Sequence, residues 1–185
     1  MGAKAGKDAT AGRRPRQDAA LDTRGLTHVD AAGRARMVDV GEKEVTARRA
    51  VAEGRVRFSA RAFALLRAQR LAKGDALAVA RLAGIQAGKR TAEWIPLCHA
   101  VPLDHLDVEI VLRPASREAE VTATAAARWT TGVEMEALVA VCAACLALYD
   151  MAKAVDRGIE IGGVRLLEKS GGRSGTFRAD RGRAG

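Results

Sequence analysis

Two charged side chains at the end of a long apolar segment are spaced for acid–base chemistry. Asp150 and Lys153 follow thirteen uncharged residues, 137–149. Because residues three apart share one face of a helix, a carboxylate and an ammonium group at this spacing lie within reach of each other. An ion pair at a helix end is the plainer interpretation, and an acid–base couple is the alternative that other candidate residues must support.

The same segment opens with two carboxylates, Glu134 and Glu136. Its richness in Ala, Leu, Met and Glu predicts a helix within 131–155 that is apolar nearly all round and therefore buried. Charges at the ends of a buried helix are costly unless they are partnered or used. We therefore expect Glu134 and Glu136 to be partnered or used, and we count both among the candidate site residues.

Cysteine and histidine side chains offer a second kind of chemistry. Cys98 and His99 follow Pro96 in a predicted loop, and an imidazole that titrates near neutral pH suits proton transfer. Cys142 and Cys145 form a C-x-x-C inside the apolar segment, where the motif is a weak signal for a metal. A zinc hydrolase that uses all four residues is a rival hypothesis. Buried packing is the stronger interpretation of Cys142 and Cys145.

A glycine-rich stretch near the end of the chain combines cations with a backbone that a ligand can approach. Lys169 and Arg173 lie within KSGGRSG, residues 169–175. Lysine, arginine and glycine N–H groups together make an anion cradle, although a flexible exit to a tail explains the stretch equally well. By contrast, residues 84–91 (GIQAGKRT) are one residue short of a phosphate-binding P-loop and lie in mid-helix, so we reject that interpretation.

The elements that must position these residues follow from periodicity and capping signals. Strict alternation at 106–112 and 121–127 predicts an antiparallel hairpin, and residues 55–58 and 159–167 read as further strands. Ser59 and Asp75 are placed to cap helices over 60–72 and 76–94. Strands and helices do not alternate as in a parallel sheet. The order predicts an α+β fold with helices packed on one face of an antiparallel sheet.

Length and composition indicate one domain with tails. We expect a disordered basic tail over 1–25, a single catalytic domain over 26–177 and a flexible tail over 178–185. The tails supply five of the nine net positive charges, and the chain has six aromatic residues. A nucleic-acid binder that works through its basic tails is therefore a rival hypothesis with little support, because stacking platforms are scarce. The remaining charge suits a polyanionic small molecule.

Compartment signals favour the cytoplasm. We find no secretory segment and predict no membrane span, and three cysteines, an odd number, favour reduced thiols. We therefore expect no membrane partner.

Several motifs in order resemble the molybdenum cofactor biosynthesis protein C family, the cyclic pyranopterin monophosphate synthases. The resemblance covers about residues 26–177 and rests on these stretches: 26–50 (LTHVDAAGRARMVDVGEKEVTARRA), 73–91 (KGDALAVARLAGIQAGKRT), 95–99 (IPLCH), 131–138 (TGVEMEAL) and 149–175, which begins YDMAKAV and ends VRLLEKSGGRSG.

The resemblance implies a ferredoxin-like α+β fold whose dimers assemble into a hexamer. It implies conversion of 3′,8-cyclo-7,8-dihydro-GTP to cyclic pyranopterin monophosphate with release of pyrophosphate. Matching positions imply an aspartate and two lysines in catalysis, Asp150, Lys153 and Lys73. They imply substrate contacts at Leu97, Cys98, His99, Met135, Glu136 and Lys169.

This chemistry needs proton transfer at several atoms and cations for the departing pyrophosphate. Carboxylates and lysines can move the protons without a cofactor or metal. Lys73, Lys169 and Arg173 suit the phosphates. Two positions depart from the family pattern: Ala100 stands where we expect proline, and Arg173 where we expect lysine. The second departure keeps the charge but changes its geometry.

Overall fold

A computed structural model describes residues 2, 34–173 and 175–180. The chain divides into residues 1–35 and 36–185, and every helix and strand lies in the second unit. The tail expected at 1–25 lies outside the described residues, Gly2 excepted, and so does part of the tail at 178–185.

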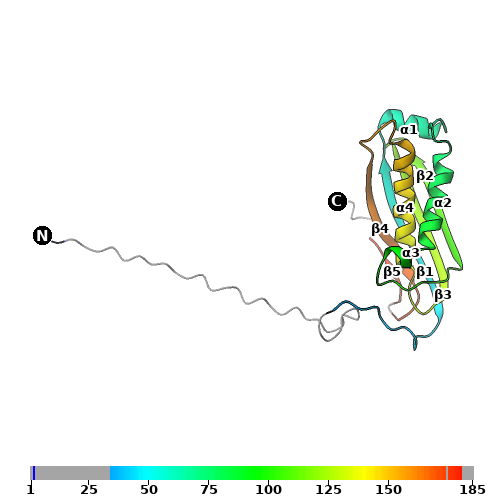
Figure 1. The fold of residues 1–185 in the computed structure, drawn as a ribbon, viewed down its shortest axis with the longest axis vertical. Helices are drawn as coiled ribbons and strands as arrows, with labels where there is room; N and C mark the ends of the chain where they lie inside the picture. Colours follow the sequence, from blue (N-terminus) through cyan, green and yellow to red (C-terminus); the bar gives the residue numbers. More distant parts are fainter. Residues whose placement is uncertain (1, 3–33, 174, 181–185) are drawn as a thin grey trace. The chain divides into compact units, whose positions relative to one another are not determined.

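Five antiparallel strands form one sheet in the order β2-β3-β1-β4-β5 (Figure 1). The first four strands have the order and direction of a ferredoxin-like fold, so the predicted fold class is confirmed. A short fifth strand at the edge was not predicted. The strands are β1 Thr46–Arg57, β2 His105–Arg113, β3 Glu118–Trp129, β4 Glu160–Ser170 and β5 Phe177–Arg178.

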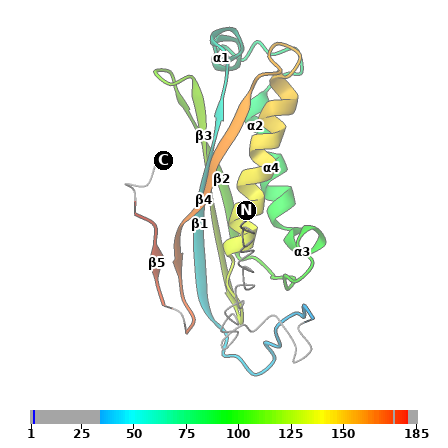
Figure 2. The same cartoon turned by 90° about the vertical axis from the view of Figure 1, so that its left-hand side faces the viewer.

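Helices α2 and α4 cover one face of this sheet (Figure 2), as predicted. The predicted caps are confirmed: the Ser59 hydroxyl accepts from the Ala62 N–H, and the Asp75 carboxylate accepts from the first turn of α2. Two helix lengths were wrong, because the first helix ends five residues early and the second breaks after Gly88. The helices are α1 Ala60–Arg67, α2 Ala76–Gly88, α3 Thr91–Trp94 and α4 Glu134–Ala152.

Small residues let the helices approach the sheet and each other closely. A Cβ atom at Gly54 would lie 2.6 Å from the Val141 side chain, so glycine lets β1 continue beneath α4 as one strand. A Cβ at Gly84 or Gly88 would lie 2.8 or 2.9 Å from a carbonyl oxygen of α4. The glycines of the stretch 84–91 are therefore a helix-packing surface.

The long helix α4 is the central buried element. By length and composition alone it would qualify as a membrane span, but 61% of the qualifying window is buried inside the fold. It packs on α2 and on β1, β3 and β4. An apolar helix that is buried in this way is a core helix. Because α4 lies along the sheet, its two ends are at opposite ends of the sheet (Figure 2).

Candidate active site

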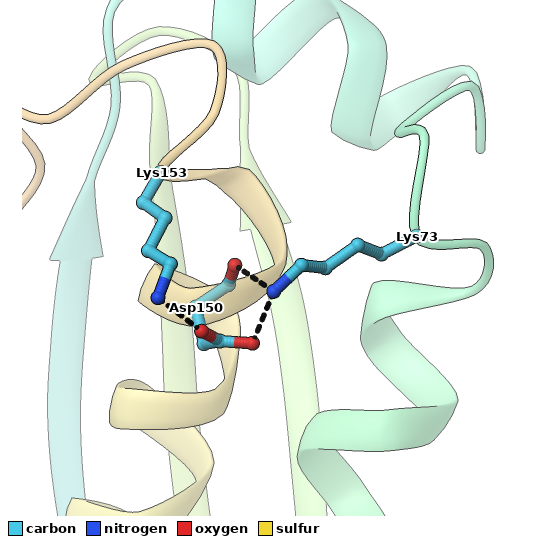
Figure 3. Close-up of polar contacts among 3 residues, drawn as sticks. All are labelled: Lys73, Asp150 and Lys153. Carbon is cyan, nitrogen blue, oxygen red and sulfur yellow. Dashed lines mark hydrogen bonds and ion pairs between the residues drawn. The ribbon is translucent and has the colours of Figure 1, made fainter.

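Three charged side chains meet at the C-terminal end of α4 (Figure 3). The Lys73 ammonium group, from the turn before α2, donates to the Asp150 carboxylate at 2.6 Å and to the Asp150 carbonyl oxygen at 3.0 Å. The Lys153 ammonium group lies 2.7 Å from the other carboxylate oxygen. The structure thus brings together the three residues expected in catalysis, one of them from 77 positions away.

The two lysines fix the charge state of this group. Hydrogen bonds from Lys153 and then Lys73 lower the pKa of Asp150 to about 2, and the bond to Asp150 raises the pKa of Lys153. Asp150 and Lys153 are therefore both charged at neutral pH. Each side chain is about half exposed, so a ligand can reach both ammonium groups without unfolding the helix end.

Glu136, one turn into α4, lies in a different environment. The residue is only 4% exposed. Burial raises the pKa of Glu136 to about 7, against an opposing hydrogen bond from its own backbone N–H and with a further contribution from the nearby Glu134. A carboxyl group with this pKa is part protonated at neutral pH and can give or take a proton.

Replacing Glu136 with Gln is expected to stabilise the protein at alkaline pH. The raised pKa means that the folded state binds more protons than the unfolded state, so the free energy of unfolding falls as pH rises from about 4.5 to 7. Glutamine removes this loss, which amounts to about 3 kcal/mol at pH 8 and vanishes near pH 4. Denaturant unfolding of both proteins at several pH values measures it. The matched control is Glu109→Gln, which removes an exposed carboxylate instead of a buried one.

The other predicted binding residues gather at this N-terminal end of α4. The Lys169 ammonium group lies 3.8 Å from the Glu134 carboxylate. Burial and the charge of Glu136 together raise the pKa of the Cys98 thiol. His99 lines a cavity with Cys98, Met135 lies next to Glu136 on α4, and Leu97 precedes Cys98 in the loop after α3.

A larger cavity, of about 740 Å³, lies beside this group and contains cations that the sequence analysis missed. Lys43 and Arg48 line it together with the predicted Arg173. The Arg48 guanidinium donates to the carbonyl oxygens of Trp129 and Thr130, both at 3.2 Å. The full lining is Glu42, Lys43, Glu44, Thr46, Arg48, Thr130, Thr131, Gly132, Gly172 and Arg173.

The glycine loop is shaped around Arg48. Gly171 and Gly172 have φ values of 98° and 71°, in the region that favours glycine. A Cβ atom at Gly172 would lie 2.6 Å from the Arg48 guanidinium carbon. The loop therefore runs directly over a cation. Arg48 reaches the loop through the pairing of β1 with β4, which local sequence does not show.

The predicted site falls into two groups at opposite ends of α4. Asp150 lies sixteen residues from Glu134, which corresponds to about 24 Å along the helix. Lys73 belongs to the Asp150 group, whereas Lys169 and Arg173 belong to the Glu134 group. One chain thus does not bring the three expected phosphate-binding cations together.

The cysteines behave as packing residues. Cys145 is fully buried, and burial raises the pKa of its thiol to about 12 and also raises that of Cys142. Within the described residues, no three His, Cys, Asp or Glu side chains form a group that could hold a metal ion. The four residues of the rival zinc site are therefore not assembled in this chain.

Replacing Cys142 and Cys145 with alanine should cost about 1 kcal/mol of stability each, through small cavities, and should leave turnover intact. Denaturant unfolding and a product assay measure the two effects. Metal analysis of the purified parent protein is the control, since loss of activity together with loss of bound zinc would revive the hydrolase hypothesis.

Comparison with known proteins identifies the family of this chain. The profile of the MoaC family matches residues 37–172. The chain is 56% identical over 156 residues to a cyclic pyranopterin monophosphate synthase of Chloroflexus aurantiacus, covering 84% of this chain and 96% of the relative. It is 57% identical to the enzyme of that name from Cereibacter sphaeroides, covering 84% and 98%, and 54% identical to that from Thermomicrobium roseum, covering 84% and 93%. The chain belongs to the MoaC family.

Proposed function

We propose that this protein is a cyclic pyranopterin monophosphate synthase of molybdenum cofactor biosynthesis. It converts 3′,8-cyclo-7,8-dihydro-GTP to cyclic pyranopterin monophosphate and releases pyrophosphate. The observation that carries the proposal is that the chain is 54–57% identical to relatives of this name, over 93–98% of the length of those relatives. The charged group at Asp150 and the cation-lined cavity at Arg173 supply the proton transfer and the phosphate binding that this reaction needs.

The proposed roles follow the two groups. Asp150 holds Lys73 and Lys153 as ammonium groups beside the reacting atoms, and Lys153 carries the proton. Glu136 is a second group that can exchange a proton near neutral pH. Lys169 and Arg173 bind the triphosphate and stabilise the departing pyrophosphate. The proposal needs no metal and no organic cofactor.

The proposal includes self-association, with dimers that assemble into a hexamer. Its support is the outer surface of the helical layer, where large apolar side chains are exposed: Leu82 at 67%, Leu146 at 53% and Trp94 at 53%. Exposed apolar side chains on three helices are what an interface between subunits would bury. We also propose a cytoplasmic location, in keeping with three free cysteines.

The test is incubation of the purified protein with 3′,8-cyclo-7,8-dihydro-GTP. The expected result is formation of cyclic pyranopterin monophosphate and pyrophosphate in equal amounts. Chromatography measures the first product, and a coupled assay measures the pyrophosphate. The Asp150→Asn variant is the matched control for a contaminating activity. Absence of product from a folded, oligomeric preparation would rule out the proposed reaction.

Replacing Arg173 with Ala should weaken substrate binding by about 10- to 100-fold, because one charged hydrogen bond to phosphate is lost. The effect is expected mainly on KM or on pyrophosphate release, as measured by steady-state and single-turnover kinetics. Arg178 is the matched control, since it is exposed and lies outside the cavity. Unchanged kinetics for Arg173→Ala would place the phosphates elsewhere.

A further inference from the structure

A second cavity, of about 550 Å³, adjoins the cation-lined one. Both cavities share Thr130, and their walls continue into each other along residues 37–44. The second cavity is lined by Met37, Val40, Gly41, Ala92, Cys98, His99, Ala100, Trp129 and Thr130. The two cavities are therefore neighbours.

The two cavities differ in chemistry. The larger one carries Lys43, Arg48 and Arg173 beside the glycine loop, whereas none of the described residues that line the smaller one is Asp, Glu, Lys or Arg. Its walls are apolar apart from a thiol, a hydroxyl and an imidazole, and it contains one indole. This division matches a nucleotide, which has a charged phosphate part and a flat ring part.

Trp129 is held in place by the fold. It ends β3 on the same face as Ala125 and Ala127, which are buried against the helices, and it pairs with Thr46 of β1. Its carbonyl oxygen accepts a hydrogen bond from Arg48 at 3.2 Å. The side chain is only partly buried, so part of the indole is available to a ligand in the smaller cavity.

We propose that Trp129 is a specificity-determining residue whose indole is the stacking platform for the fused ring system of the substrate. Aromatic side chains stack on heteroaromatic rings, and a fixed platform loses little entropy on binding. Arg48 positions the platform and the phosphate cavity together, because it contacts the carbonyl of Trp129 and the glycine loop. This inference rests on the proposed function.

Fluorescence provides a direct binding test, since the chain has two tryptophans, Trp94 and Trp129. The Trp94→Phe variant leaves Trp129 as the only indole, and the Trp129→Phe variant leaves Trp94, which lies outside both cavity linings. GTP, which shares a fused ring and a triphosphate with the substrate, is the probe. GTP should quench the emission of Trp94→Phe saturably and that of Trp129→Phe little, while inorganic triphosphate should quench neither. Equal quenching of both variants, or none in Trp94→Phe, would overturn the proposal.

Kinetics provide the second test. Trp129→Ala should raise KM for 3′,8-cyclo-7,8-dihydro-GTP about 10- to 100-fold with a smaller change in kcat, and Trp129→Phe should recover most of the loss. Trp94→Phe is the control, because it keeps an aromatic side chain at the exposed apolar surface and lies outside both cavity linings. If the parent protein is active and the folded Trp129→Ala protein has an unchanged KM, the proposed role of Trp129 is refuted and the proposed function is not. An inactive parent protein would refute the proposed function instead.

Discussion

Replacing Asp150 with Asn is expected to lower turnover by about 10²-fold or more while the fold stays intact. The carboxylate contacts Lys73 at 2.6 Å and Lys153 at 2.7 Å, and it stays ionised because its pKa is about 2. A neutral amide keeps the shape of the side chain but not the charge that holds two ammonium groups together. The substitution should therefore release Lys153, the proton carrier, and Lys73 from their positions without creating a cavity.

Lys153→Ala should have an effect of similar size, for a different reason. The hydrogen bond from Lys153 is the main cause of the low pKa of Asp150, so its loss should raise that pKa toward the ordinary range. Lys153→Arg separates charge from proton transfer, because guanidinium stays protonated at all working pH values. Turnover of Lys153→Arg should therefore remain low although the ion pair with Asp150 is retained.

The measurement is kcat against pH for each variant, with circular dichroism and thermal unfolding to establish the fold. Asp156→Asn is a matched control: Asp156 also has a lowered pKa, but its hydrogen bonds come from the backbone of Ser59 and Gly158. That variant should lose some stability and keep its turnover. Near-normal turnover of Asp150→Asn or Lys153→Ala would refute the assignment.

Local signals in the sequence predicted much of the fold. The caps at Ser59 and Asp75 and the hairpin of β2 and β3 were confirmed because each depends on residues that are close in sequence. The break after Gly88 and the single strand through Gly54 depend on contacts with α4, which local patterns do not contain. At these two places tertiary packing, and not local residue propensity, determined the secondary structure.

The candidate site was predictable to a similar degree. The spacing of Asp150 and Lys153 pointed to their contact, whereas Lys73 joined them only through the resemblance to a family. The raised pKa of Glu136 follows from burial, and the contribution of Arg48 follows from the strand pairing that sets it beneath the glycine loop. Neither can be read from local sequence.

Glu136 and Asp150, by contrast, are expected to act on one substrate although a single chain holds them apart. They lie fourteen residues apart on α4, which corresponds to about 21 Å along its axis. The structure has α4 as one continuous helix without proline, so no kink shortens this distance. A two-fold dimer with antiparallel copies of α4 would bring the Glu136 end of one chain beside the Asp150 end of the other and would create two equivalent sites.

Mixing two inactive variants tests this arrangement. Glu136→Ala and Asp150→Ala are unfolded together, refolded and assayed. In a mixed dimer one site loses both residues and the other keeps both, so random pairing should restore about a quarter of the parent activity. The matched control mixes Asp150→Ala with Lys153→Ala. These residues belong to the same end of α4, so every site in that mixture lacks one of them and activity should stay low. If mass spectrometry confirms mixed dimers in the first mixture and activity does not return, each site lies within one chain.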